Sequence, residues 1–401
     1  MMSDLPRDLA EEVFSRLPMK SLRGFRSACK NWNTLFKDRS FTKNHLAQAK
    51  AAAAKEFMVV MVIEFRVYLM TLDLHGIHKG VDPSMDRKGK LISLEDSDGV
   101  DISLVYHCDG LLLCIAKDYA RFVVWNPYSG KTLWLKPRSP HDRLDWYRYA
   151  IGYQNSKSCR SYKILRFVDG LHGFDGFVEY EIYELESNSW RALDVTSEWF
   201  IEFYARGVSV NGNTSWFAQQ KRQGNRHGEI ADFLICFDFT AERFGPRLRL
   251  PFHSYIGDTV TLSSVREEQL DVLFQRKETA RIKIWVTTKN EPKEVRWNKL
   301  FLAVDMIPLT YVQFGPSQGS FFIDQENRVA VVFDKDDEDD DWFDRNIAYI
   351  IGEDGYFRQV DLGSSTEIHR PFGCSYVPSL ALIKQCATRK IKIDYFIFFC
   401  L

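Results

Sequence analysis

Residues 4–36 carry apolar positions at the period of an α-helix, which predicts three short helices. Their apolar stripes are Leu9, Val13 and Leu17, then Leu22, Phe25 and Cys29, and then Trp32, Leu35 and Phe36. Pro6 suits a first helical turn, where its missing N–H removes no intrahelical bond, and Pro18 is expected to end the first helix. A segment this short cannot enclose a sufficient core alone, so we expect its stripes to dock on another surface, in this chain or in a partner.

The pattern changes at residue 57. From there, apolar or alternating runs are short, and Gly, Asn, Asp and Pro separate them, which is typical of an all-β domain. The run AKAAAAKEF lies just before this change. Because alanine is the strongest helix former, a helical connector is predicted over residues 47–56.

The β region repeats one pattern, in which an apolar strand with a central aromatic residue runs into a polar turn and a second aromatic follows. The pairs are Trp125 and Trp134, Tyr183 and Trp190, Phe237 and Phe244, Trp285 and Trp297, and Tyr349 and Phe357. A weaker sixth copy lies at residues 67–74. A period near fifty residues with several strands per unit predicts a β-propeller of about six blades. A strand near residues 373–384 is expected to pair back into the first blade; a pair of β-sandwiches is the alternative.

Composition narrows the class of protein. The chain has 401 residues and a formal net charge of −1, so it lacks the basic character expected of a nucleic-acid-binding domain, and no nucleic-acid partner is expected. The eight cysteines include no C-x-x-C pair, and several lie in apolar runs. They are interpreted as reduced core residues of a cytoplasmic or nuclear protein, without a disulfide framework or a zinc site.

Targeting and membrane signals are not expected. Met1-Met2-Ser3-Asp4 leads into the first helix without a basic or apolar signal region. The apolar runs at residues 57–63 and 395–401 are far shorter than the roughly twenty residues that span a bilayer. Neither secretion nor a membrane anchor is predicted.

Candidate chemistry is sparse. The acidic run 334–344 lacks the glycine and glutamate positions of a calcium-binding loop and is expected to be a solvated loop, although it could recognise a basic partner. His75 and His78 have no third ligand nearby, and neither G-x-S-x-G nor H-E-x-x-H occurs. We therefore expect no catalytic residue, no metal and no cofactor.

One run suits the recognition of a target protein. Residues 141–150, HDRLDWYRYA, combine aromatic and arginine side chains, which are the residue types enriched at binding hot spots. The candidate target-binding residues are Arg143, Trp146, Tyr147 and Tyr149.

The N-terminal segment resembles an F-box. It follows the pattern LPxDLxxEVxxRLPxxSLxxFRxxCKxW almost position for position over residues 5–32. The resemblance implies binding to the small Skp-family adaptor of SCF ubiquitin ligases, and through it to a cullin. The adaptor-binding residues that it implies are Leu5, Pro6, Leu9, Glu12, Val13, Leu17, Pro18, Leu22, Cys29 and Trp32.

The β region resembles the F-box-associated domain of a large plant family, whose fold is related to kelch propellers. The resemblance rests on Cys108–Cys114 (CDGLLLC), Val124–Pro127 (VWNP), Ile151–Tyr153 (IGY) and Tyr162–Phe167 (YKILRF). Asp109-Gly110 predicts a tight turn into a buried strand, and Asn126-Pro127 opens a turn that Gly130 completes. The apolar tail from Cys386 departs from the family pattern.

These inferences predict an α+β protein with four parts: an F-box at residues 1–46, a helical connector at 47–56, a propeller at 57–384 and an atypical tail at 385–401. The expected function is that of a non-catalytic substrate-recognition subunit of an SCF ligase, which brings an unknown protein substrate to the complex. Two alternatives remain: a glycan-binding or enzymatic propeller, and an adaptor-binding protein with no degraded target.

Overall fold

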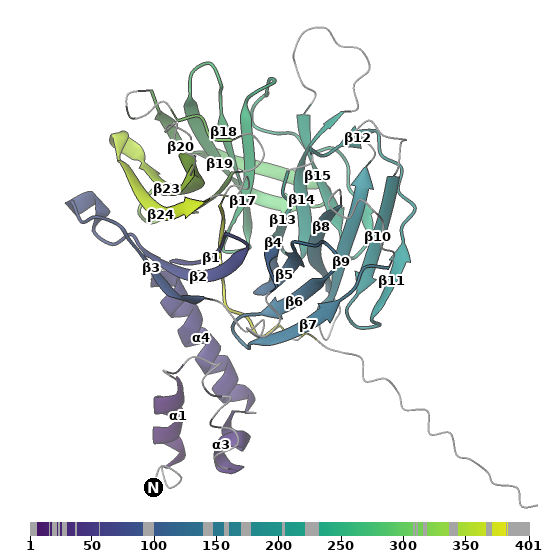
Figure 1. Ribbon diagram of the computed structural model, residues 1–401, viewed down its shortest axis with the longest axis vertical. Helices are drawn as coiled ribbons and strands as arrows, with labels where there is room; N and C mark the ends of the chain where they lie inside the picture. The colour runs from purple at the N-terminus through teal and green to yellow at the C-terminus, as the bar shows by residue number, and fades with distance from the viewer. Residues whose placement is uncertain are drawn as a thin grey trace, which may run out of the picture.

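The protein consists of N-terminal helices followed by six β-sheets arranged in a ring (Figure 1). This computed structural model describes residues 6–15, 17, 22, 25, 30–36, 38–55, 57–90, 100–138, 147–155, 160–169, 178–202, 205–220, 232–307, 309, 312–315, 319–336, 344–365, 371–381 and 383. The all-β domain is a six-bladed propeller, as the repeat predicts, and the alternative of two β-sandwiches is wrong.

The helices are α1 (Arg7–Ser15), α3 (Lys30–Leu35) and α4 (Arg39–Lys55). Pro6 precedes α1, and its carbonyl accepts a hydrogen bond from the Ala10 N–H at 3.0 Å. Most of the second predicted helix lies outside the described residues. The predicted connector is the second half of α4, which begins at Arg39 rather than at residue 47.

A small apolar core joins these helices. Its buried members are Ala10, Phe14, Leu22, Trp32, Leu35, Phe36 and Phe41. The Phe14 ring lies edge-on to the rings of Trp32 and Phe36, with centroids 5.1 and 5.0 Å apart. Phe41 belongs to α4, so the long helix supplies part of the core that residues 4–36 cannot complete alone.

Each blade is one antiparallel sheet. The first blade has β25 (Phe372–Ser375) innermost, then β1 (Phe57–Ile63), β2 (Arg66–Asp73) and β3 (Ser84–Lys90). The second contains β4 (Ile102–Cys108), β5 (Leu111–Ala116), β6 (Phe122–Asn126) and β7 (Lys131–Leu135). The third contains β8 (Arg148–Asn155), β9 (Arg160–Asp169), β10 (Val178–Glu184) and β11 (Ser189–Ala192).

The remaining blades follow in chain order. The fourth contains β12 (Trp199–Phe200), β13 (Val208–Val210), β14 (Asn213–Gln220), β15 (Asp232–Asp238) and β16 (Arg243–Phe244). The fifth contains β17 (Thr259–Val265), β18 (Gln269–Gln275), β19 (Arg281–Glu291) and β20 (Glu294–Asp305). The sixth contains β21 (Ser320–Asp324), β22 (Val329–Asp336), β23 (Asp344–Gly352) and β24 (Phe357–Ser365). Short 3₁₀ helices lie at Ile77–Lys79 and Glu353–Gly355.

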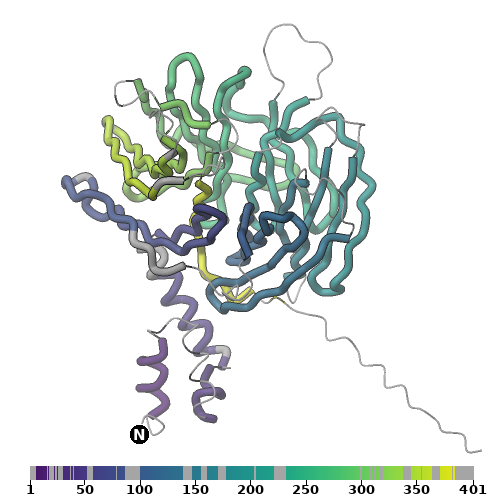
Figure 2. Tube along the Cα trace, in the orientation of Figure 1, coloured from purple at the N-terminus to yellow at the C-terminus, as the bar shows by residue number. Residues whose placement is uncertain are grey.

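The C-terminal strand closes the ring. β25 pairs antiparallel with β1, from Val59 opposite Ser375 to Val62 opposite Phe372. Figure 2 shows the yellow C-terminal segment beside the purple first strands of the propeller. The predicted return strand is therefore confirmed, although it spans only residues 372–375.

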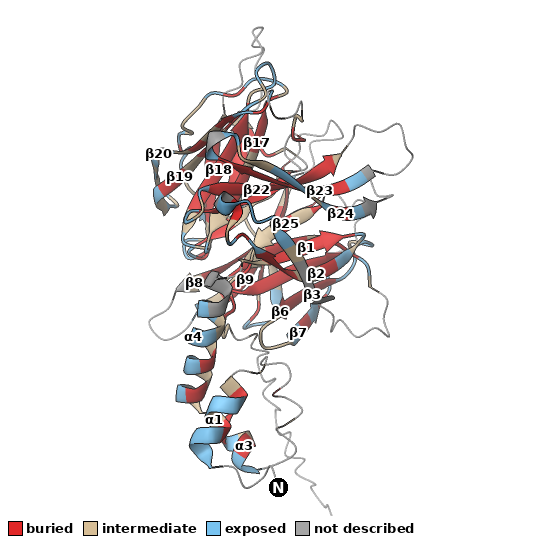
Figure 3. Ribbon diagram, turned by 90° about the vertical axis from the view of Figure 1, so that its left-hand side faces the viewer, coloured by how far each residue is buried: buried red, intermediate tan, exposed pale blue. Residues whose placement is uncertain are grey.

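The predicted aromatic pairs locate the two outer strands of five blades. Tyr183 lies directly opposite Trp190, and Phe237 lies opposite Phe244. The other pairs join β6 to β7, β19 to β20, and β23 to β24 with a small offset in register. The weaker sixth copy corresponds to β2. Six apolar clusters lie between neighbouring blades, so each blade is buried by the two blades beside it (Figure 3).

The ends of the inner strands meet at one face of the ring, around Glu267 in the β17–β18 turn. Its carboxylate accepts hydrogen bonds from the backbone N–H groups of Asp109 and Gly110, which follow β4, at 2.5 and 3.2 Å. Its carbonyl accepts one from the N–H of Asn211, which follows β13, at 3.3 Å. Asp109 and Gly110 have positive φ angles of 53° and 69°, which confirms the predicted tight turn. We call this side of the ring the strand-end face.

One buried carboxyl group has no partner within the described residues. Asp271 in β18 is fully buried, and neither of its carboxylate oxygens has a hydrogen-bond partner. Burial raises the pKa of Asp271 well above its usual value. This carboxyl group therefore favours the neutral form in the folded protein.

Replacing Trp125 with Ala is expected to lower the free energy of unfolding by about 3–5 kcal/mol, because Trp125 is only 2% exposed between the first two blades. Trp134 is 41% exposed, so Trp134→Ala is the matched control and should change stability much less. Chemical denaturation of both variants measures the difference. Equal effects would show that Trp125 is not a core residue.

Asp271 should make stability depend on pH. An unfolded Asp ionises with a pKa of about 3.9, whereas the pKa of folded Asp271 is raised. The neutral carboxyl group of Asp271 therefore contributes to the stability of the folded protein below about pH 4. This contribution is lost as the pH rises through the pKa that Asp271 has in the folded state. The melting temperature of wild type should fall relative to that of Asp271→Asn between pH 4 and 8. The exposed control Asp194→Asn should show no such trend, and a pH-independent gap for Asp271→Asn would contradict the assignment.

Candidate functional site

Helix α1 has one face packed against the helical core and one face exposed to solvent. Ala10 and Phe14 are buried in the helical core, whereas Leu9 and Val13 are 50% and 48% exposed. Leu9 and Val13 are four residues apart and so lie on the same side of the helix. Pro6 and Glu12 are also exposed. Figure 3 shows the exposed outer side of α1 in pale blue. We call Pro6, Leu9, Glu12 and Val13 the α1 surface.

Arg7 fastens this helix to the start of α4. Its guanidinium lies 2.9 Å from Glu11 within α1 and 2.6 Å from Asp38, the residue before α4. Both ion pairs are exposed to solvent and so contribute little stability individually. Their effect is on orientation, because they connect the α1 surface to the long helix that leads into the propeller.

Several other predicted adaptor-binding residues lie elsewhere. Leu22 and Trp32 are 0% and 6% exposed, so they form the core of the helical region itself, and the expectation that they face a partner is wrong for this structure. Leu17 is half-buried beside the same core. Leu5, Pro18 and Cys29 lie outside the described residues. Apolar periodicity marks the residues of all three stripes in the same way. Only the packing of the helices shows which of these residues are buried in the helical core and which are exposed.

The structure also corrects two of the predicted target-binding residues. Tyr147 and Tyr149 are 3% and 0% exposed, at the start of inner strand β8. The Tyr147 hydroxyl donates to the Glu179 carboxylate, and the Tyr149 ring packs edge-on against Phe122 with centroids 5.2 Å apart. Burial raises the pKa of both phenols. Arg143 and Trp146 lie outside the described residues.

An exposed apolar pair that the sequence analysis missed lies before the fifth blade. Tyr255 and Ile256 are 41% and 60% exposed in the connection between β16 and β17. The Arg276 guanidinium lies 4.9 Å from the Tyr255 ring centroid. This connection leads into the beginning of β17, so it lies on the opposite side of the ring from Glu267. We call that side the strand-start face. The segment PFHSYIGDT carries no local signal that separates exposed from buried aromatics.

The helices and the propeller meet at His45 in α4, which is 3% exposed. Its Nε2 lies 2.7 Å from the Leu17 carbonyl oxygen, and its Nδ1 lies 2.5 Å from the Tyr128 hydroxyl in the β6–β7 turn. A carbonyl can only accept, so Nε2 donates, and in the neutral ring Nδ1 accepts from Tyr128. Tyr128 also packs against the helical core. We call the contact of His45, the Leu17 carbonyl and Tyr128 the junction.

The chain segment that closes the ring also supports the junction. The Tyr128 N–H donates to the Tyr376 hydroxyl at 3.3 Å, and that hydroxyl lies 3.5 Å from the Gly110 carbonyl oxygen. The Asn126 side-chain amide donates to the Ser379 and Ala381 carbonyls at 3.1 and 3.0 Å. Tyr376 thus contacts both the β4–β5 turn and the β6–β7 turn, which places the junction on the strand-end face.

Among the described residues, no group of three or more His, Cys, Asp or Glu side chains is arranged to hold a metal ion. Within the same part of the chain, no helix is long and apolar enough to span a membrane.

Two domain families match the chain. An F-box domain matches residues 2–44, and an F-box associated beta propeller domain matches residues 58–383. The F-box protein At3g17620 of Arabidopsis thaliana is 61% identical over 98% of this chain and 98% of its own. The F-box/kelch-repeat protein At3g16740 of the same species is 56% identical over 94% of this chain and 98% of its own.

Likeness to solved structures is remote. The Dos1 propeller covers 77% of this chain and 69% of its own, at 8% identity and a TM-score of 0.33. The helical region with its α1 surface, the closed six-bladed ring and the two domain matches agree with one another. The chain belongs to the plant F-box proteins that carry an F-box-associated β-propeller domain.

Proposed function

We propose that this protein is the substrate-recognition subunit of an SCF-type ubiquitin ligase, in which the F-box docks on a Skp-family adaptor and the propeller captures a target protein. The observation that carries the proposal is the α1 surface. Leu9 and Val13 lie side by side on an F-box helix whose opposite face is already buried. An apolar pair left exposed in a known interaction domain is best explained by a partner protein.

The proposed mechanism is positional rather than catalytic. A target held beside a ubiquitin-charged enzyme reacts at a high effective concentration, because a bimolecular encounter becomes nearly intramolecular. This effect is lost when the geometry of the complex prevents the target and the ubiquitin-charged enzyme from being held next to each other. The junction supports the mechanism, because His45 connects α4 to the propeller through Tyr128.

The strand-start face is the proposed site of target capture. The junction lies on the strand-end face, so an adaptor bound to the α1 surface leaves the other side of the ring open to a second protein. Tyr255, Ile256 and Arg276 provide an exposed apolar pair with a cation beside it on that side. Tyrosine and arginine are residue types enriched among binding hot spots.

Replacing Leu9 or Val13 with Asp should abolish adaptor binding, because the new carboxylate would be buried without a partner at the interface, at a cost of several kcal/mol. Both side chains are half exposed in the free protein, so the F-box should stay folded. The measurement is a pull-down with purified Skp-family adaptor.

Lys50→Asp is the control for this pull-down, because Lys50 is exposed on α4 away from the α1 surface and should leave binding intact. Circular dichroism confirms that each variant is folded. Retained binding by both Leu9→Asp and Val13→Asp would show that the α1 surface is not the adaptor site.

Tyr128→Phe should loosen the junction without affecting adaptor binding. It leaves the buried His45 Nδ1 without a donor, which costs about 1–3 kcal/mol. Hydrogen exchange of the α4 amides should become faster. The control Tyr119→Phe removes a hydroxyl that contacts Ser103 elsewhere in the propeller and should leave α4 unchanged. Equal α4 exchange in both variants would argue against a structural role for the junction.

A further inference from the structure

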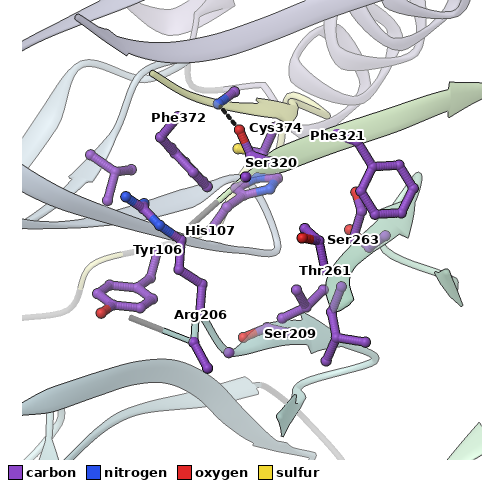
Figure 4. A pocket seen from close by; sticks show the side chains of 18 of the residues that line it. Tyr106, His107, Arg206, Ser209, Thr261, Ser263, Ser320, Phe321, Phe372 and Cys374 are labelled. Atoms are coloured by element: carbon purple, nitrogen blue, oxygen red, sulfur yellow. Dashed lines mark hydrogen bonds between the residues drawn. The ribbon is translucent and has the colours of Figure 1, made fainter. Parts of the chain in front are cut away.

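A cavity of about 60 Å³ lies at the centre of the ring. Inner strands β4, β13, β17, β21 and β25 line it, together with the residues that precede β13 (Figure 4). A single water needs roughly 10–15 Å³ of such volume. The cavity therefore has room for a small polar group and accompanying waters.

On the strand-end side, the cavity is lined by His107, which lies beside Glu267. Glu267 lies 2.7 Å from His107 Nε2, and both side chains are largely buried. Burial alone would raise the pKa of Glu267, but the charge and hydrogen bond of His107 and the two backbone N–H donors hold it below the usual range. This carboxylate is therefore ionised and already fully engaged at that end.

Arg206 enters the cavity from the segment before β13. Its guanidinium lies 4.3 Å from the centroid of the Phe372 ring, and its Nη1 is buried without a hydrogen-bond partner among the described residues. The residue as a whole is partly exposed, so solvent reaches the rest of the side chain. Figure 4 shows Arg206 on one side of the cavity, near Tyr106, His107 and Phe372, and Thr261 with Ser263 on the other.

The charge of Arg206 is not balanced by any carboxylate in the described part of the chain. Burial lowers the pKa of Arg206, and the groups that act in the opposite direction are the phenols of Tyr106 and Tyr119 and the thiol of Cys374 rather than carboxylates. The Thr261 hydroxyl, which also lines the cavity, is buried without a hydrogen-bond partner in the same described set. A half-buried cation and a hydroxyl without a described partner thus line one small cavity.

We propose that the central cavity is a binding site for a small carboxylate, held by Arg206 with Thr261 as an additional donor. The planar guanidinium fork matches the two oxygens of a carboxylate, and such charge-assisted hydrogen bonds are about twice as strong as neutral ones. One arginine balances one negative charge, which favours a monoanion over phosphate. The carboxylate is either a free small acid or the side chain of an acidic residue on a bound protein.

Part of the cavity lining lies on the side of the ring proposed for target capture. Its lining includes Val260 and Thr261 near the start of β17, Ser320 at the start of β21 and Phe372 at the start of β25. The lining also includes His107 near the end of β4 and Ser264 near the end of β17, so the cavity extends along the centre of the ring between the two faces. Carboxylate binding does not require the adaptor or the α1 surface, so it can be tested independently of the proposed ligase function.

The experiment measures the melting temperature of the full chain against sodium acetate, with sodium chloride at equal ionic strength as the reference. A ligand that binds only the folded state stabilises it by RT ln(1 + L/Kd), where L is the ligand concentration, and so raises this temperature as the concentration increases. The wild type should respond to acetate and should respond less to inorganic phosphate. Arg206→Met should weaken the apparent acetate affinity about tenfold or more. Arg247→Met removes an arginine that also lies over an aromatic ring, but outside the cavity, and should respond like wild type.

A second variant covers the case in which Arg206→Met does not fold. Thr261→Val retains the arginine and removes only the hydroxyl, and it should weaken acetate binding several-fold.

N-acetyl-aspartate amide distinguishes the two sources of carboxylate. If N-acetyl-aspartate amide binds more tightly than acetate, the carboxylate is an acidic side chain of a bound protein. If N-acetyl-aspartate amide does not bind, the carboxylate is a free small acid. The proposal is overturned if acetate has no effect beyond chloride on the wild type, or if the folded Arg206→Met or Thr261→Val variant responds as the wild type does.

Discussion

Closure of the ring is the constraint on which the rest of the propeller depends. The apolar clusters lie between neighbouring blades, so a blade at an open end would leave one apolar face in water. The four-residue strand β25 prevents this by pairing with β1, which lies at the opposite end of the propeller domain in the sequence. Because this pairing joins the first blade to residues that follow the sixth, the first blade cannot be completed until the C-terminal part of the domain has been made.

Closure and the orientation of the F-box are connected through the same residues. After β25 the chain passes the second blade, where Tyr376 contacts both the Gly110 carbonyl and the Tyr128 backbone. Tyr128 in turn holds His45 of α4. The F-box is therefore attached through a folded contact that the ring-closing segment supports. An open ring would lose the geometry between the two halves as well as its own stability.

The two faces of the propeller follow from this attachment. Within the described residues, the junction and the Glu267 turn lie on the strand-end face, where Glu267 accepts hydrogen bonds from two backbone N–H groups and lies beside His107. The strand-start face retains groups without such partners in the described chain: the exposed pair Tyr255 and Ile256, and Arg206 inside the ring. A polar group that is buried or half-buried without a partner is energetically unfavourable in the free protein. Its presence on the side away from the F-box is consistent with that side receiving a ligand.

The sequence by itself determined the modular order, the helical first region, the all-β second region and the repeat of blades, because helical and strand periods and turn residues are local properties. Asp109-Gly110 and the aromatic pairs located real turns and outer strands for the same reason. Only the tertiary structure decided which apolar residues face inward: Leu22, Trp32, Tyr147 and Tyr149 are buried, whereas Leu9, Val13, Tyr255 and Ile256 are exposed. Only it brought together Tyr128 with His45, and Arg206 with Thr261. These contacts join residues far apart in the chain, and their pairing depends on how whole blades pack around a closed ring, which no local pattern encodes.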